Sequence, residues 1–282
     1  MAEAVATGVA RIREAFDTAR DEGRATLMPY MMGGFPDMET SVVVADAYAD
    51  AGADLVELGV PFSDPLADGP VIHAAGTRAL AAGATLKGVL EICERLAARV
   101  PVVPMVYSNM ALARGAEEFA ALLADAGAAG AIVPDLPLGE ADELGEAVSG
   151  AGLAPIPLVA PTTPAERRRL ICQSAMGFVY VVSDTRVTGE RDELPADLAD
   201  LVRAVREDSA VPVAVGFGIG TAEQAAAVGR IADGVIVGSR LVRAVAEADG
   251  PAGATTAVGE FIHDARDAMA KPAVPWDRLR NP

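Results

Sequence analysis

The chain has 282 residues and a formal net charge of −17; 51% of its residues are hydrophobic and only 4% are aromatic. This length and apolar content suit one large domain, whereas the negative charge argues against nucleic acid as a partner, because nucleic-acid binding depends on clustered Lys and Arg. No apolar run approaches the ~18 residues of a membrane-spanning helix, and residues 1–14 lack the apolar segment of a secretory signal. We therefore expect a cytoplasmic protein with no membrane or nucleic-acid partner.

Short apolar runs alternate along the chain with segments that have the helical period. We expect strands at 25–31, 54–58, 102–106, 131–133, 154–159, 178–182, 211–215 and 234–237. We expect helices at 40–51, 86–99, 116–126, 139–149, 164–172, 196–206 and 222–231. This alternation implies parallel pairing with right-handed crossovers, and eight such units indicate a closed (β/α)8 barrel, the TIM-barrel fold.

The barrel accounts for one domain over residues 1–282, with its core at about 25–246 and extra helices at both ends. The long polar segment 183–194 follows the sixth strand, so we expect it to be a mobile lid at the catalytic end. Residues 248–254 are expected to form a flexible joint before a last helix at about 255–270, and a proline-rich tail follows at 271–282.

The segment 59–70 combines three prolines with two glycines, which predicts a stiff, irregular loop. Glu57 ends the strand before this loop, and Asp68 lies near the loop's far end. Two carboxylates thus meet where a barrel enzyme builds its site, and an acid in an apolar strand is costly to bury unless it is paired or used. On the residues alone, a capping acid followed by a turn aspartate explains the pattern equally well.

Two glycine sites follow the last two predicted strands. Gly-Phe-Gly-Ile-Gly occupies 216–220, and Gly238-Ser239 comes after the eighth strand. Loops at these two places often bind phosphate in barrels, because glycine lets backbone N–H groups approach the anion. A Rossmann motif is excluded, since the glycines open a seventh unit and no acidic residue follows at the required place.

Histidine and cysteine are scarce. His73 and His263 are the only two histidines, which argues against a histidine-based triad or a His-rich metal site. Cys93 and Cys172 lie far apart in helix-like segments, so we expect buried free thiols, in keeping with a reducing compartment. The sequence therefore predicts neither a metal nor a disulfide.

Residues 55–70, Leu-Val-Glu-Leu-Gly-Val-Pro-Phe-Ser-Asp-Pro-Leu-Ala-Asp-Gly-Pro, resemble the signature of the tryptophan synthase α chain family. The resemblance continues in the family's order and covers about 25–246, at 105–109, 133–137, 160–163, 180–183, 187–189, 216–219 and 238–239. It implies the (β/α)8 barrel. It also implies a lyase of L-tryptophan biosynthesis that cleaves indole-3-glycerol phosphate to indole and glyceraldehyde 3-phosphate by a retro-aldol reaction, without metal or cofactor.

The resemblance also implies catalytic roles for three residues. Glu57 matches the acid–base group that protonates indole C3 and later takes the proton of the glycerol hydroxyl. Asp68 matches the carboxylate that accepts the indole N–H and stabilises the positive charge developing there. Tyr180 matches the active-site tyrosine beside the glutamate. A glutamate in an apolar pocket suits the first role, since desolvation raises its pKa.

Further matches imply contacts with the substrate and with a partner. The implied substrate-binding positions are Phe62, Tyr107, Thr188, Gly189, Phe217, Gly218, Gly238 and Ser239. We expect Met105, Ile132 and Ile156 to line the indole pocket together with Phe62. In the family a tryptophan synthase β chain completes an α2β2 complex, and the matching contact positions are Pro61, Asp64 and Pro137.

Three positions depart from the family's pattern. Met32 replaces a threonine that faces the pocket, Met110 replaces a proline, and Arg186 replaces a glycine. Because Glu57 and Asp68 are both present, these departures indicate tuning of the pocket rather than loss of chemistry. Two alternatives stay open: a free-standing indole-3-glycerol phosphate lyase that releases indole without a β chain, and a non-catalytic barrel that regulates a partner chain.

Overall fold

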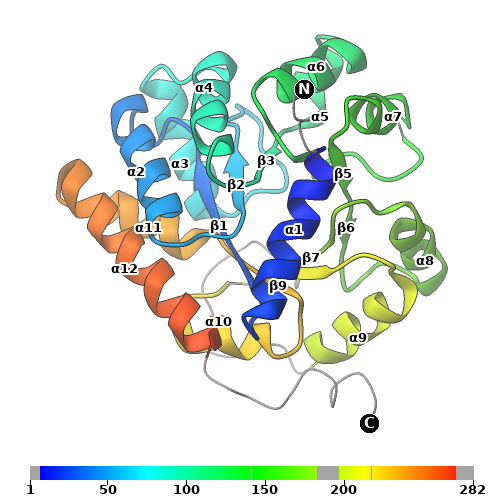
Figure 1. Ribbon diagram of the computed structural model, residues 1–282. Helices are drawn as coiled ribbons and strands as arrows, with labels where there is room; N and C mark the ends of the chain where they lie inside the picture. Colours follow the sequence, from blue (N-terminus) through cyan, green and yellow to red (C-terminus); the bar gives the residue numbers. More distant parts are fainter. Residues whose placement is uncertain (1–6, 141, 183–196, 217, 271–282) are drawn as a thin grey trace, which may run out of the picture.

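The computed structural model describes residues 7–140, 142–182, 197–216 and 218–270, and its strands form one parallel sheet surrounded by helices (Figure 1). The strands are β1 (Thr26–Met32), β2 (Val56–Gly59), β3 (Val102–Met105), β4 (Gly130–Ile132), β5 (Ala154–Ile156), β6 (Leu158–Val159), β7 (Val179–Val182), β8 (Val213–Gly216) and β9 (Gly234–Val237). Each of the eight predicted strands is present, and the predicted barrel is confirmed.

The sheet curls into a nearly closed barrel. Its order is β5-β4-β3-β2-β1-β9-β8-β7-β6, so the first strand pairs with both the second and the last. The two ends of that order, β5 and β6, are separated in the chain only by Pro157, whose carbonyl oxygen accepts the N–H of Tyr180 at 3.0 Å. The strand predicted at 154–159 is therefore interrupted, because proline has no N–H to donate to the ladder.

The helices cover the outside of the barrel. They are α1 (Gly8–Asp21), α2 (Met38–Asp50), α3 (Pro70–Ala81), α4 (Leu86–Ala97), α5 (Ser108–Leu112), α6 (Ala116–Asp125), α7 (Asp142–Gly150), α8 (Ala165–Ser174), α9 (Leu198–Asp208), α10 (Ala222–Gly229), α11 (Ser239–Glu247) and α12 (Gly250–Ala270). The seven predicted helices are confirmed. The helices α3, α5 and α11 were not predicted, because each begins directly where loop or glycine signals dominate the sequence.

The predicted flexible joint at 248–254 is wrong. Helix α12 begins at Gly250, so only two residues separate it from α11. Gly250 adopts the left-handed conformation, with φ of 73°, which few other residues tolerate. Pro251 then lies in the first turn of α12, where a missing N–H costs no helical hydrogen bond. The glycine and proline that suggested a joint in fact start a helix.

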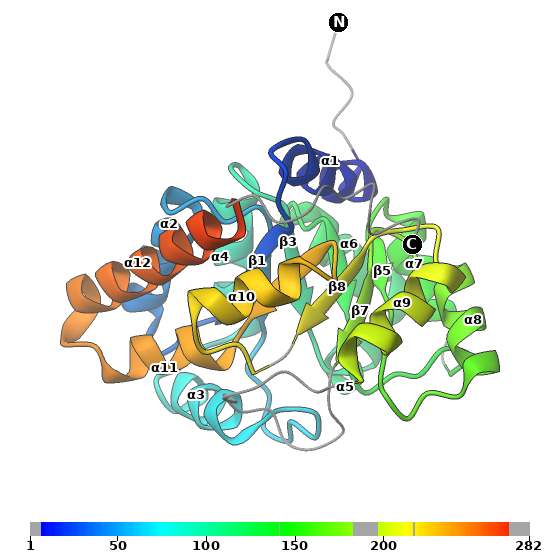
Figure 2. The same cartoon turned by 90° about the horizontal axis from the view of Figure 1, so that it is seen from below.

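Helix α1 closes one end of the barrel, opposite α3 and α5 (Figure 2). Ile12 and Phe16 are buried among inward-facing barrel residues, and the ring centroids of Phe16 and Phe178 lie 5.8 Å apart. The Arg11 guanidinium donates to three backbone carbonyl oxygens, those of Ala97 at 2.5 Å, Gly127 at 2.9 Å and Val100 at 3.1 Å. This end is therefore filled, and Arg11 satisfies three of its carbonyl groups, whereas the buried Thr26 hydroxyl has no partner among the described residues.

An ionic cluster fastens the C-terminal helix to the same end. Asp54 accepts two hydrogen bonds from the buried Arg24, at 2.5 and 2.7 Å, and one from Arg266 of α12 at 3.0 Å. Arg266 also bonds Glu22 at 2.8 Å. Because α12 packs chiefly on α2, α10 and α11, the cluster ties the last helix to the start of the barrel.

Both cysteines are buried free thiols, as expected. Burial raises the pKa of Cys93 to about 12, so this thiol is not a nucleophile at neutral pH. Within the described ranges, none of the helices combines the length and the apolar character needed to cross a membrane.

Candidate active site

The candidate site lies at the end of the barrel that α1 leaves open. Glu57 of β2 is paired in register with Tyr30 of β1 and Val103 of β3. Its side chain is buried, with 2% of its surface exposed, and neither carboxylate oxygen has a hydrogen-bond partner in the described chain. Burial, and to a lesser degree the charge of Asp68, raise the pKa of Glu57 from 4.5 to about 8. At neutral pH it keeps its proton, so it can act first as an acid and then as a base.

Asp68 is held in place by Tyr107. The Tyr107 hydroxyl donates to Asp68 Oδ1 at 2.9 Å and accepts the backbone N–H of Ala67 at 3.0 Å. Burial raises the pKa of Asp68, while this hydrogen bond and the nearby His73 lower it. Residues 60–69 contain only turns and bends before α3, as the prolines predicted. The carboxylate therefore has a fixed direction although it lies on a loop.

The predicted aromatic residues gather around this aspartate. The Phe62 ring stacks on Tyr107 with centroids 5.2 Å apart and an interplanar angle of 21°. Tyr107 was predicted as a substrate contact, and the structure gives it a second use as the residue that orients Asp68. Ile132 and Ile156 belong to the same cluster of barrel residues as Tyr180, and Met105 packs against it, whereas Phe62 lies outside that cluster.

Tyr180 of β7 lies on the opposite side of the barrel from the loop that carries Asp68. It is 9% exposed, and burial together with the charge of Glu57 raises the pKa of its hydroxyl. A Cβ atom at Gly216 would stand 2.3 Å from the Tyr180 hydroxyl oxygen. Gly216 is therefore required to make room for Tyr180, whereas the sequence had indicated only a phosphate turn.

Tyr30 of β1 is a site residue that sequence reasoning missed. It is 5% exposed, and burial raises the pKa of its hydroxyl, to which Asp68, Glu57, Tyr107 and Tyr180 add in that order. Tyr30 therefore lies near both carboxyl groups and both of the other site tyrosines. A tyrosine between Pro29 and Met31 in an apolar strand is a weak signal, and its pairing with Glu57 could not be read from spacing.

Two helices begin at the glycine sites where a phosphate was predicted, and among their described residues only the N-terminus of α11 lacks a side-chain cap. At α10, Thr221 and Gln224 form a capping box, and the Gln224 side chain accepts the N–H groups of Gly220 at 2.7 Å and Thr221 at 3.2 Å. At α11, Gly238 and Ser239 begin the helix with no side-chain cap. A Cβ at Gly238 would make only ordinary contacts, at 3.7 Å or more, so packing does not demand this glycine. The N-terminus of α11 is thus the better anion site.

The other predicted positions are placed as follows. Asp64 and Pro137 are exposed, whereas Pro61 is buried. Ser63 donates its hydroxyl to Asp64 at 2.5 Å, and the neighbouring Leu66 is 90% exposed. Gly218 is partly buried near the start of α10. Thr188, Gly189 and Phe217 lie outside the described residues, as do Arg186, the predicted lid 183–194 and the tail 271–282.

This sequence is similar to proteins of a known family over most of its length. A family model for the tryptophan synthase alpha chain matches residues 16–270. The tryptophan synthase alpha chain of Synechococcus sp. (strain CC9902) is 50% identical over 236 residues, which are 83% of this chain and 88% of that protein. The alpha chain of Carboxydothermus hydrogenoformans is 47% identical over 239 residues, which are 84% of this chain and 90% of that protein.

Solved structures agree with these relatives. A tryptophan synthase structure from Mycobacterium tuberculosis matches with a TM-score of 0.86 and 36% identity, covering 93% of this chain and 99% of that chain. The tryptophan synthase subunit alpha from Legionella pneumophila matches with a TM-score of 0.83 and 36% identity, with the same coverage of 93% and 99%. The resemblance seen in the sequence is confirmed, and the chain belongs to the tryptophan synthase alpha chain family of lyases in tryptophan biosynthesis.

Proposed function

We propose that this chain cleaves indole-3-glycerol phosphate to indole and glyceraldehyde 3-phosphate, as the α subunit of a tryptophan synthase. The observation that supports this best is that the site holds two carboxyl groups in different surroundings. Glu57 is buried without a partner and keeps its proton near neutral pH. Asp68 is oriented by Tyr107 on the loop above it. One group suits proton transfer and the other suits stabilisation of a cation.

In the proposed reaction Glu57 gives its proton to C3 of the indole ring. The ring nitrogen becomes positively charged, and its N–H donates to the carboxylate of Asp68. Glu57, now ionised, takes the proton of the hydroxyl on the side-chain carbon bonded to C3. The electrons of that O–H bond form the aldehyde C=O, and the electrons of the breaking C–C bond return to the ring. Indole and the aldehyde are released, and Glu57 is ready for the next cycle because the hydroxyl proton has replaced the one it gave to C3.

The rest of the site would orient the substrate along this axis. Met105, Ile132 and Ile156 offer an apolar wall for the indole ring. The uncapped start of α11, at Gly238 and Ser239, suits the phosphate group at the other end. By the family resemblance we assign Thr188 to a hydrogen bond with Asp68, Gly189 to the phosphate and Phe217 to the substrate; all three lie outside the described residues.

The proposed partner is a tryptophan synthase β chain in an α2β2 complex in the cytoplasm. Leu66 is 90% exposed beside the exposed Asp64, on the loop that also carries Asp68. Contact with a partner at this loop would remove the apolar surface of Leu66 from water. Because docking and chemistry would share one loop, a partner that prefers the closed form would raise the rate by its differential affinity.

The decisive experiment measures indole release from indole-3-glycerol phosphate by the purified chain, alone and with a tryptophan synthase β chain. The proposal expects slow release alone and acceleration by the β chain, and Asp64→Ala should weaken the acceleration far more than the activity of the isolated chain. Fast release that no β chain alters would favour the free-standing lyase. No release under either condition would reject the proposed reaction and favour the regulatory barrel.

A further inference from the structure

The hydroxyl of Tyr30 lies against the strand that carries Glu57. Tyr30 points into the barrel from β1, and a Cβ atom at Gly59 of β2 would stand only 2.1 Å from its hydroxyl oxygen. Glu57 and Gly59 are two residues apart, so their side-chain positions face the same side of the strand, roughly 7 Å from one another. Strand side chains stand roughly perpendicular to the sheet, so the Glu57 carboxyl group and the Tyr30 hydroxyl lie over the same face of β2. Gly59 thus admits the hydroxyl to the neighbourhood of the carboxyl group.

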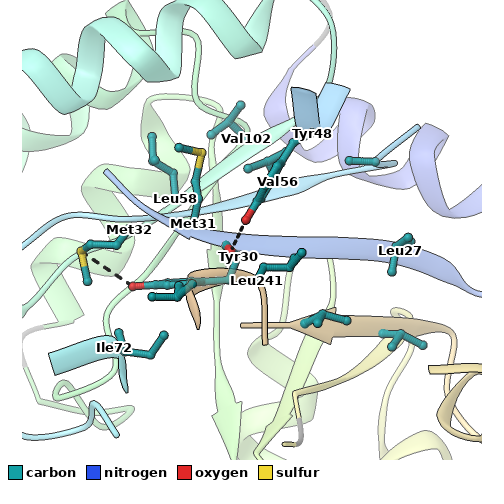
Figure 3. Close-up of a cluster of buried hydrophobic side chains, with 14 of the residues drawn as sticks. Leu27, Tyr30, Met31, Met32, Tyr48, Val56, Leu58, Ile72, Val102 and Leu241 are labelled. Carbon is teal, nitrogen blue, oxygen red and sulfur yellow. Dashed lines mark hydrogen bonds between the residues drawn. The ribbon is translucent and has the colours of Figure 1, made fainter. Parts of the chain in front are cut away.

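The hydrogen of this hydroxyl is poorly used. Its one partner among the residues with defined placement is the sulfur of Met32, at 4.0 Å (Figure 3). A thioether is a weak acceptor. The same view shows Tyr48, whose hydroxyl donates to the carbonyl oxygen of Tyr30 at 3.0 Å and is fully used in holding the backbone. The two tyrosines of this cluster therefore differ: the Tyr48 hydroxyl holds the backbone, whereas the Tyr30 hydroxyl can still donate a strong hydrogen bond.

Glu57 needs the donor that Tyr30 can offer, because neither of its carboxyl oxygens accepts a hydrogen bond from the described residues. This is tolerable while the group is protonated, but an ionised carboxylate buried without a hydrogen bond is costly. Among the groups that face it, Asp68 carries the wrong charge and Tyr107 already donates to Asp68. His73 influences Asp68 from α3. The hydroxyl of Tyr180 lies over Gly216 of β8, whereas that of Tyr30 lies over β2 itself.

We propose that Tyr30 is a positioning residue for Glu57: when Glu57 loses its proton, the two side chains move into hydrogen-bond contact, and the Tyr30 hydroxyl donates to the carboxylate instead of to the sulfur of Met32. The O–H bond of Tyr30 stays intact, and only its acceptor changes. The proton leaves Glu57 for solvent in the free enzyme and for indole C3 in the reaction. The consequence for rate rests on the proposed function, but the hydrogen bond itself does not.

The first test titrates Glu57 in the isolated full chain without substrate. Difference infrared spectroscopy follows its carboxyl band, which Glu57→Gln identifies by removing it. Tyr30→Phe should raise the midpoint by about one pH unit, because the ionised form loses a hydrogen bond to a charged group. Met32→Leu should move the midpoint slightly down, because the hydroxyl loses its competing acceptor. Tyr48→Phe is the matched control and should leave the midpoint unchanged.

A midpoint that Tyr30→Phe leaves unchanged or lowers, in a variant with wild-type circular dichroism, would overturn the inference. The second test measures cleavage against pH. Tyr30→Phe should lower kcat about tenfold at neutral pH with KM within about twofold, and the loss should shrink as the pH rises past 8. A raised KM with unchanged kcat would make Tyr30 only a wall of the pocket. If the wild-type chain cleaves nothing, the proposed function fails, and the titration still decides the role of Tyr30.

Discussion

The two ends of the barrel differ in the kind of buried side-chain group that lacks a partner. Among the described residues, the end covered by α1 leaves only the neutral Thr26 hydroxyl unpaired. At the end covered by α1, Arg11 donates to three carbonyl oxygens, and Arg24 and Arg266 both bind Asp54. At the open end, Glu57 lacks any partner in the described chain, and Tyr30 has only a distant sulfur. Satisfied polar groups stabilise a fold, whereas unsatisfied ones cost free energy unless a ligand uses them. The difference indicates which end holds the molecule together and which end performs chemistry.

Glycines show the same contrast. At the closed end, a Cβ at Gly8 would stand 2.2 Å from the carbonyl oxygen of Ala129, so glycine allows α1 to pack against the barrel backbone. At the open end, Gly59 and Gly216 make room for the hydroxyl groups of Tyr30 and Tyr180. One end uses glycine to bring backbone against backbone, and the other uses it to place functional groups. Substitutions at the two ends should therefore change different measurable quantities.

The largest effect is expected at Glu57. Glu57→Gln keeps the size of the side chain but removes the proton that moves in both steps, so kcat should fall by about 10²–10⁴-fold. Steady-state assays of indole release measure it, with binding of a non-cleavable phosphate analogue as the control for an intact site. Near-normal turnover in this variant would contradict the catalytic assignment.

Asp68→Asn should follow, with a loss of about 10²–10³-fold in kcat. The amide keeps the shape of the carboxylate but offers no negative charge to the cationic ring. Retained affinity for the same analogue would show that the phosphate end is undisturbed. If the rate instead stayed within a few-fold of wild type, Asp68 would serve only the turn before α3.

The same Glu57→Gln substitution that lowers kcat should raise the free energy of unfolding. Its pKa is 4.5 in the ordinary state and about 8 in the fold, so the folded chain binds the extra proton between these values. Stability therefore falls as the pH rises from about 5 to 8, and this loss should be absent in Glu57→Gln. Chemical denaturation at several pH values should find the variant more stable by about 2–4 kcal/mol at pH 8.5 and much less so at pH 5. Equal differences at both pH values would contradict the raised pKa.

The smallest effect is expected at the closed end, where substitution of Arg11 should change the stability of the fold and not the activity. Arg11→Met keeps the apolar stem but leaves three carbonyl oxygens without their donor, which should cost about 2 kcal/mol of stability. Urea unfolding measures this cost, and indole release per folded molecule should be unchanged. A loss of activity without a loss of stability would show that the closed end communicates with the site.

Much of this contrast was visible in the sequence. The prolines and glycines of 59–70 predicted an irregular loop, and Glu57 in an apolar strand indicated a buried acid, because these depend on local backbone chemistry and on the cost of burying charge. The start of α12 was misread, since Gly250 and Pro251 suit a helix start as well as a joint.

The sequence by itself determined the strands, most of the helices, the barrel and the two carboxyl groups, because strand alternation, turn residues and hydrophobic periods are properties of neighbouring residues. Only the tertiary structure decided that Tyr30 lies beside Glu57 and that Tyr107 orients Asp68, because these pairs join residues 27 and 39 positions apart. Register between strands and the direction of a hydroxyl depend on closure of the whole barrel, which no short segment contains.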